Sequence, residues 1–205
     1  MSGTRTTTSY ALLGLLAVRD WTTYELAKQV RRSLNWFWPR AERKLYDEPK
    51  RLVEQGLATS VREQTGRRAR TVYRITGAGR AALREWLDEP AAPRGIEFEA
   101  MVKVFFADAG SLEQLTATLE RIAAEAEERI AALAEMAAAR PVPFAQRAHI
   151  SAIGLRLQYE QEDAVRRWAR WARAQVEQWP DTTDPGDWDA LAALDDLAAA
   201  RPAGG

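Results

Sequence analysis

The 205-residue sequence contains no cysteine and only one histidine, His149. Without cysteine there can be no disulfide bond, no thiolate metal site and no cysteine nucleophile. No stretch comes near the roughly 20 consecutive apolar residues of a membrane-spanning helix. The first ten residues also lack the apolar run of a secretory signal. We therefore expect a cytoplasmic protein.

Patterns that are typical of catalytic sites are missing as well. Ser151 lies close to His149 in sequence, but no third partner and no nucleophile-elbow motif accompany it. The acidic runs at 125–128 and 160–163 contain none of the Glu-x-x-His pairs of a carboxylate metal site. The glycines at 77 and 79 lack the strand and lysine context of a phosphate loop. We predict that the protein is not an enzyme and needs no metal or cofactor.

The charge of the chain is divided unevenly, although 29 basic and 29 acidic residues balance overall. Residues 1–90 hold 17 Lys and Arg against 10 Asp and Glu, a net charge of +7. The remaining 12 basic and 19 acidic residues give the rest of the chain a net charge of −7. A basic half next to an acidic half indicates that the basic half binds a polyanion. Chance segregation of charge between two domains is the alternative.

The basic half begins with two predicted helices. Thr8 and Ser9 are placed to cap an apolar helix that ends near Val18. Thr22 and Glu25 then form a capping box, with Trp21 and Leu26 at the two positions of a hydrophobic staple. The second helix is expected to end near Leu34.

A third helix is predicted from Pro39 to Gln55, because proline favours the first turn of a helix and Gly56 follows as a stop signal. Two short strands, 57–63 and 70–75, follow with a glycine-containing hairpin loop between them. Thr76 then caps a fourth helix. Three helices, a two-stranded wing and a closing helix make residues 1–90 a winged helix-turn-helix domain.

In this architecture the third helix enters the major groove and the wing contacts phosphates or the minor groove. If Leu45 and Leu52 point inward, the opposite face and flanks of that helix are basic. The predicted DNA contacts are Arg40, Arg43, Lys44, Tyr46 and Lys50 on the helix, and Arg67, Arg68 and Arg70 on the wing. The alternative is a solvated charged face on a protein-interaction module that does not bind DNA and uses the acidic half as a docking arm.

The C-terminal half changes character. Apolar residues recur every three or four positions over 111–140 and again over 144–179, which predicts two long amphipathic helices. Each helix has one apolar stripe along its length, and a hairpin of that length is not expected to bury both stripes within itself. We therefore predict that residues 91–180 form a helical dimerisation domain. Residues 181–205 are expected to form a loosely ordered tail. The predicted dimerisation residues are Leu115, Leu119, Ile122, Ile153, Leu157, Val165, Trp168 and Val176.

Eight tryptophans are many for a chain of this length. Trp36 and Trp38, or Trp168 and Trp171, are candidates for an apolar pocket that takes a planar ligand. Aromatic residues at helical spacing also serve as core or dimer-interface residues. Trp36 and Trp38 are equally compatible with packing against a partner chain.

Several segments in order resemble the PadR family of transcriptional regulators. They are Tyr10-Ala-Leu-Leu-Gly-Leu-Leu, Thr23-Tyr24-Glu25-Leu26-Ala27, Leu45-Tyr46, Arg51-Leu52-Val53-Glu54-Gln55-Gly56-Leu57, and Gly66-Arg67-Arg68 leading to Tyr73-Arg74-Ile75-Thr76-Gly77-Ala78-Gly79-Arg80. The long helices resemble the subfamily with the larger C-terminal domain. The resemblance implies a homodimer on a pseudo-palindromic operator, often a repressor, and commonly one that responds to a small aromatic or drug-like molecule. Thr23 and Tyr24 join the predicted DNA contacts.

One position departs from the family pattern. Pro49 lies inside the predicted third helix, where an apolar helix former is usual. Proline removes a backbone hydrogen bond there and either kinks the helix or begins a new segment capped by Asp47.

Overall fold

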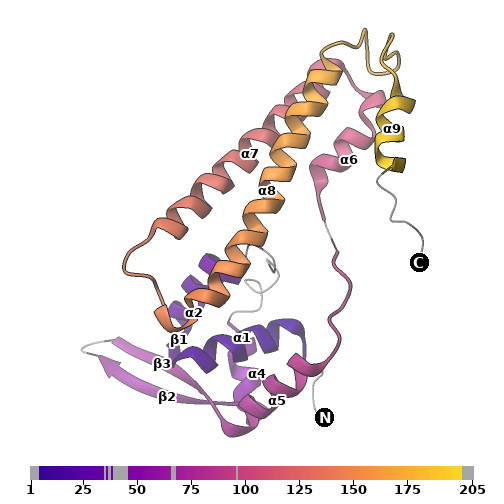
Figure 1. Ribbon diagram of the computed structural model, residues 1–205. Helices are drawn as coiled ribbons and strands as arrows, with labels where there is room; N and C mark the ends of the chain where they lie inside the picture. The colour runs from indigo at the N-terminus through magenta and orange to yellow at the C-terminus, as the bar shows by residue number, and fades with distance from the viewer. Residues whose placement is uncertain are drawn as a thin grey trace. The chain divides into compact units, whose positions relative to one another are not determined.

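The computed structural model describes residues 5–34, 36, 38, 46–65, 68–95 and 97–199 (Figure 1). The chain divides into two units, residues 1–94 and 95–205. The fold is mainly α-helical with one small antiparallel sheet, so the predicted fold class is confirmed. None of the helices in the described part of the chain is both long enough and apolar enough to cross a membrane.

The first helix, α1 (Thr7–Val18), is capped by Thr6, two residues before the predicted cap at Thr8. Thr6 has the extended backbone of an N-cap, and its hydroxyl accepts a hydrogen bond from the Ser9 N–H at 3.4 Å. Thr8 and Ser9 were therefore wrongly predicted as the cap. They lie in the first turn of the helix, and both are buried.

The second helix, α2 (Thr23–Gln29), follows a two-residue strand, β1 (Trp21–Thr22), and continues into a π-helical turn at Val30–Leu34. The capping box of Thr22 and Glu25 is confirmed, and the staple residues Trp21 and Leu26 are both buried. Strand β1 was not predicted, because two residues are too few to show an alternating pattern.

The rest of the N-terminal unit is α4 (Glu48–Glu54), β2 (Ala58–Thr65), β3 (Arg68–Ile75) and α5 (Gly77–Asp88). The sheet has the antiparallel order β1-β3-β2. Both wing strands extend two residues further than predicted, and Thr65 lies opposite Arg68. Thr76 caps α5 as predicted, since its hydroxyl accepts from the Gly79 N–H at 3.0 Å.

The N-terminal unit has one apolar core to which α1, α2 and α4 all contribute. Leu26 of α2 and Leu52 of α4 have no exposed surface. Their burial follows from the amphipathic spacing of each helix, which turns one apolar face to the interior. On α1, Leu12 and Leu13 have no exposed surface and Leu16 is 1% exposed. The exposed faces of α2 and α4 are thereby left for other contacts.

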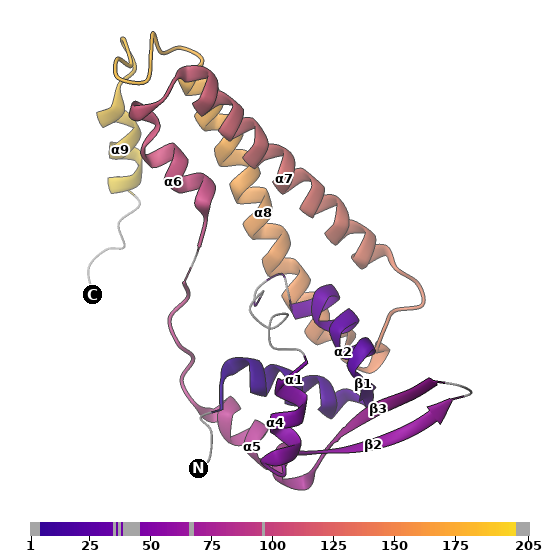
Figure 2. The same ribbon diagram turned by 180° about the vertical axis from the view of Figure 1, so that it is seen from behind.

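The C-terminal unit contains α6 (Glu99–Phe105), α7 (Leu112–Ala138), α8 (Ala148–Val176) and α9 (Ala190–Ala199), with short 3₁₀ turns at Ala107–Ala109 and Ala145–Arg147. Helices α7 and α8 lie side by side and antiparallel, and α6 and α9 lie at the end where α7 begins and α8 ends (Figures 1 and 2). Both long helices are slightly shorter than predicted.

The hairpin buries more of its own apolar surface than expected. Of the predicted dimerisation residues, Leu115, Leu119, Ile122 and Val176 are buried in the core of this unit, and Val165 and Trp168 pack against it. The α7 stripe is thus covered within one chain, and the part that these residues take in dimerisation stays a prediction. The physical reason is that α6 and Trp179 add apolar cover at that end. Ile153 and Leu157 are the exceptions, with 71% and 57% of their surface exposed.

The segment after α8 contacts the hairpin. The indole N–H of Trp188 donates to Gln175 Oε1 at 3.0 Å, and the ring lies 5.3 Å from that of Trp179. The Thr182 hydroxyl donates to the Gly110 carbonyl at 3.2 Å. Residues 181–188, which were predicted as part of a loose tail, thus have defined partners on α8 and on the turn before α7.

Candidate nucleic-acid interface

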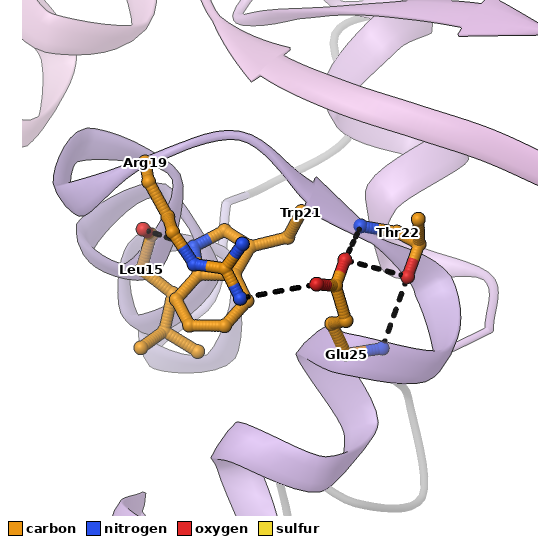
Figure 3. Close-up of polar contacts among 5 residues, drawn as sticks. All are labelled: Leu15, Arg19, Trp21, Thr22 and Glu25. Atoms are coloured by element: carbon orange, nitrogen blue, oxygen red, sulfur yellow. Dashed lines mark hydrogen bonds and ion pairs between the residues drawn. The ribbon is translucent and has the colours of Figure 1, made fainter. Parts of the chain in front are cut away.

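The first turn of α2 is held by a reciprocal set of hydrogen bonds (Figure 3). The Thr22 N–H donates to Glu25 Oε2 at 2.9 Å, and the Glu25 N–H donates to the Thr22 hydroxyl at 3.2 Å. The backbone hydrogen bond from Thr22 lowers the pKa of Glu25, outweighing the opposing effect of burial. The predicted contact residues Thr23 and Tyr24 are the first two residues of this helix, and the Tyr24 side chain is 72% exposed.

The connection between α1 and α2 is also fixed by side chains (Figure 3). The Trp21 indole N–H donates to the Leu15 carbonyl at 2.7 Å. The Arg19 guanidinium lies over the Trp21 ring and pairs with Glu25 at 3.1 Å. These contacts connect the end of α1 to the first turn of α2, the turn from which Tyr24 projects.

Helix α4 is a short helix of its own. Tyr46 and Asp47 form a turn, and Pro49 occupies the second helical position. The missing N–H of proline costs nothing there, because the first N–H groups of a helix have no partner within it. The helix that contains Pro49 begins at Glu48, directly after this turn, so one continuous helix over 39–55 is wrong. Positions 39–45, where the predicted third helix would begin, lie outside the described residues. Asp47 is the N-cap residue, but its side chain makes no capping hydrogen bond.

Two predicted contact residues lie exposed at α4. Tyr46 is 65% exposed, and the Lys50 side chain is 66% exposed, with Nζ 3.9 Å from an Asp47 oxygen. Such an exposed pair is weak and leaves the ammonium group available to a phosphate. The predicted contacts Arg40, Arg43 and Lys44, like Leu45, lie outside the described residues.

The wing supplies the third group of predicted contacts. Arg70 on β3 pairs across the strands with Glu63 at 2.9 Å, and its side chain is 52% exposed. Arg68 is the first residue of β3, but its side chain is outside the described part, as is all of Arg67. Arg74 pairs with Asp20 at 2.6 Å, so it joins the wing to the end of α1.

Two features of this unit were missed by sequence reasoning. Lys28, Arg31 and Arg32 are exposed near the end of α2, opposite the buried Leu26 and Val30. Their three- and four-residue spacing was a usable signal. The second is Glu48, the first residue of α4, whose carboxylate is buried with 5% exposure. No local pattern identifies it, since its main partner is 39 positions away in sequence.

The two tryptophan pairs predicted as alternative ligand sites, Trp36 with Trp38 and Trp168 with Trp171, lie in different units. Trp168 packs against the core of its unit and Trp171 is 49% exposed. The indole N–H of Trp38 donates to the Thr8 hydroxyl at 3.1 Å, and Trp36 is partly buried. Among the residues whose positions are described, no group of three or more His, Asp or Glu side chains is arranged to hold a metal ion.

A cavity of about 840 Å³ lies elsewhere in the C-terminal unit, between α6, α7 and α8. Phe98 and Ile122 give it apolar walls, while Arg129 and Glu162 form a pair at 2.8 Å on its rim. Burial raises the pKa of Glu162, against the opposing effect of Arg129.

The fold and this site define the class of the protein as a winged helix-turn-helix protein with a helical C-terminal hairpin. Residues 12–85 match the transcriptional regulator PadR-like family, and residues 98–177 match the virulence activator alpha C-terminal family. Residues 12–85 therefore carry a PadR-like domain, and the second match fits the longer C-terminal region. The predicted resemblance is confirmed.

Three relatives illustrate the similarity. The Bacillus subtilis negative transcriptional regulator PadR is 28% identical over 99 residues, 47% of this chain and 54% of that protein. A probable transcriptional regulator of Mycobacterium tuberculosis is 36% identical over 87 residues, 41% of this chain and 45% of that protein. The structure of the Vibrio cholerae virulence activator AphA is 28% identical with a TM-score of 0.66, covering 83% of this chain and 98% of that one.

The sequence alignments thus span about half the length of the curated relatives. The fold similarity reaches further. The crystal structure of B. subtilis PadR in complex with operator DNA has a TM-score of 0.73 at 21% identity, covering 83% of this chain and 99% of that one.

Proposed function

We propose that this protein regulates transcription by binding double-stranded DNA through its N-terminal unit. The observation that carries the proposal is that the exposed predicted DNA contacts all belong to one packed unit. Tyr24 on α2, Lys50 on α4 and Arg70 on β3 project from three elements of one packed unit, and that half of the chain has a net charge of +7. These are the elements that winged-helix domains apply to the groove and the phosphates. The B. subtilis PadR complex with operator DNA supports the proposal.

A mobility-shift assay on the DNA upstream of its own gene tests it. We expect saturable, salt-sensitive binding that is strongly weakened in the double variant Arg67→Ala and Arg68→Ala. The matched control is Arg121→Ala with Arg147→Ala, which removes two exposed arginines from the C-terminal unit. No shift at micromolar protein in low salt, or an equal loss in the control, would contradict DNA binding and favour a protein-interaction module.

We also propose that the protein acts as a homodimer on a pseudo-palindromic operator. The support comes from large apolar side chains that remain exposed in the C-terminal unit. Phe105 on α6 is 78% exposed, and Ile153 and Leu157 lie one turn apart on α8. Apolar residues gathered on one helix face are typical of an association surface. A second copy would bring two reading units to one duplex, as two-fold operators require.

The proposed role is that of a repressor released by a small aromatic molecule. The cavity between α6, α7 and α8 has the size of ligand sites in general, about 300–1,000 Å³. B. subtilis PadR has been crystallised with p-coumaric acid. Adding p-coumaric acid and a panel of other planar aromatic acids to the protein–DNA complex tests this role. Release by a member of the panel supports it, and an unchanged shift throughout contradicts it.

A further inference from the structure

The first turn of α1 contacts α4 through a buried hydrogen bond. The Ser9 hydroxyl donates to Glu48 Oε1, and both residues are buried, with exposures of 1% and 5%. Glu48 is the first residue of α4, so the bond meets this helix at its start. We infer that Ser9 and Glu48 are positioning residues that set the orientation of α4 against α1. The consequence for DNA contacts rests on the proposed function.

Ser9 is itself held in place. Its hydroxyl accepts a hydrogen bond from the Thr6 N–H at 2.9 Å, as part of the capping box of α1. The same oxygen therefore accepts from the start of α1 and donates to the start of α4. The Ser9 backbone N–H is also engaged, with the Thr6 hydroxyl. The serine cannot turn away without breaking the cap.

Glu48 has few other ways to be satisfied. A buried carboxylate is unfavourable unless it is hydrogen-bonded or paired with a cation. Its second oxygen lies 3.8 Å from Arg51 Nη1, at the limit of an ion pair, and the Arg51 side chain is 62% exposed. The Ser9 hydroxyl is therefore its close buried partner among the described residues. Bonds to charged groups are among the stronger hydrogen bonds in proteins.

Thr8, the residue before Ser9 in α1, makes a similar contact with Trp38. Thr8, 3% exposed, accepts a hydrogen bond from the Trp38 indole at 3.1 Å. Trp38 precedes α4 by ten residues and Glu48 opens it, so adjacent residues of α1 contact the chain on both sides of positions 39–47. The predicted contacts Arg40, Arg43 and Lys44 fall within that interval of the sequence.

Substitutions at Ser9 and Glu48 can distinguish an effect on the orientation of α4 from a general loss of stability of the unit. We expect Ser9→Ala and Glu48→Ala each to weaken binding to the upstream DNA at least about tenfold, and the double variant to be no worse than either alone. Glu48→Gln keeps an oxygen that can accept from Ser9, so its affinity should stay within about threefold of the parent. The control is Leu13→Ala, a fully buried residue of the same helix that destabilises the unit by opening a cavity. All affinities are measured well below the unfolding temperature of each variant.

Amide hydrogen exchange of the free protein provides a readout that needs no DNA. Ser9→Ala should accelerate exchange in α4 more than in α5, whereas Leu13→Ala should accelerate both alike. Equal acceleration of α4 and α5 by Ser9→Ala, or a loss of affinity in Leu13→Ala as large as in Ser9→Ala, would overturn the inference. A parent protein that binds no DNA would overturn the proposed function, and the exchange comparison would still decide the positioning of α4.

Discussion

The guanidinium carbon of Arg19 lies 3.7 Å from the centre of the Trp21 ring, over its face. Trp21 also lies opposite Tyr73 of β3 in the sheet and donates its indole N–H to α1 at Leu15. One buried tryptophan thus contacts α1 and the wing strand, two residues before α2 begins. The relative placement of α2 and the wing depends on this residue.

Replacing Trp21 with alanine should lower the free energy of unfolding of the N-terminal unit by about 3–5 kcal/mol, the usual cost of truncating a buried aromatic residue. Urea denaturation followed by circular dichroism measures it. Trp171→Ala is the matched control, because Trp171 is 49% exposed and should cost far less. Equal losses in the two variants would show that Trp21 does not have this role.

Gly79 should not tolerate a side chain. A Cβ at this position would lie 2.1 Å from the Leu57 carbonyl oxygen, a backbone atom that cannot move aside cheaply. Gly79→Ala should therefore lower stability by about 1–3 kcal/mol or more, as over-packing does. Gly77 is in the same helical turn with open space around it. Gly77→Ala should leave stability unchanged or raise it by up to about 1 kcal/mol. The reverse order in thermal denaturation would refute the close packing of α5 on Leu57.

The pH dependence of stability should reflect Glu25. Its pKa in the folded protein lies below the ordinary value of 4.5, chiefly because the Thr22 N–H donates to the carboxylate. Folding therefore favours the charged form. The stabilisation is complete above the unfolded pKa and is lost as the pH falls through the folded pKa. Parent and Glu25→Gln should differ in stability at pH 7 and converge once the pH falls below the folded pKa of Glu25.

Carboxyl-carbon NMR titration checks the same point directly. Glu25 should titrate at a lower pH than Glu162, whose pKa is raised by burial. A Glu25 midpoint equal to or above that of Glu162 would contradict the capping geometry.

Introducing charge on the exposed face of α8 should dissociate the proposed dimer. The variant Ile153→Glu with Leu157→Glu places two carboxylates where the apolar side chains are exposed. We expect sedimentation velocity to show monomer for this variant and dimer for the parent. Ser151→Glu with Ala152→Glu adds the same charge at exposed positions that are rotated by more than roughly 100° from the middle of that face. This control should remain dimeric. A parent that sediments as a monomer would exclude the homodimer.

Local signals in the sequence were sufficient to predict the starts of α2 and α5. The capping residues Thr22, Glu25 and Thr76 act within three positions of their partners, so their hydrogen bonds can be anticipated from spacing alone. Pro49 was informative for the same reason. It argued against a straight helix through this position, and in the structure it lies in the first turn of a helix that begins at Glu48.

Contacts between distant segments could not be anticipated in this way. Trp21 and Tyr73 pair across 52 positions, and Ser9 and Glu48 across 39. Neither pair has a periodic or local pattern, because each depends on the packing of separate elements. The burial of Leu115 and Ile122 within one chain was missed similarly, since α6 was not expected to cover that face.

The salt dependence of DNA affinity in Lys50→Ala and Lys103→Ala tests DNA binding by the N-terminal unit most directly. The two lysines are closely matched: their side chains are 66% and 64% exposed, and each lies near one acidic neighbour. If Lys50 contacts a phosphate, its loss should reduce the slope of log K against log salt by about 0.9. Lys103→Ala should leave that slope unchanged. Equal slopes in both variants and the parent, or a loss confined to Lys103→Ala, would contradict the account.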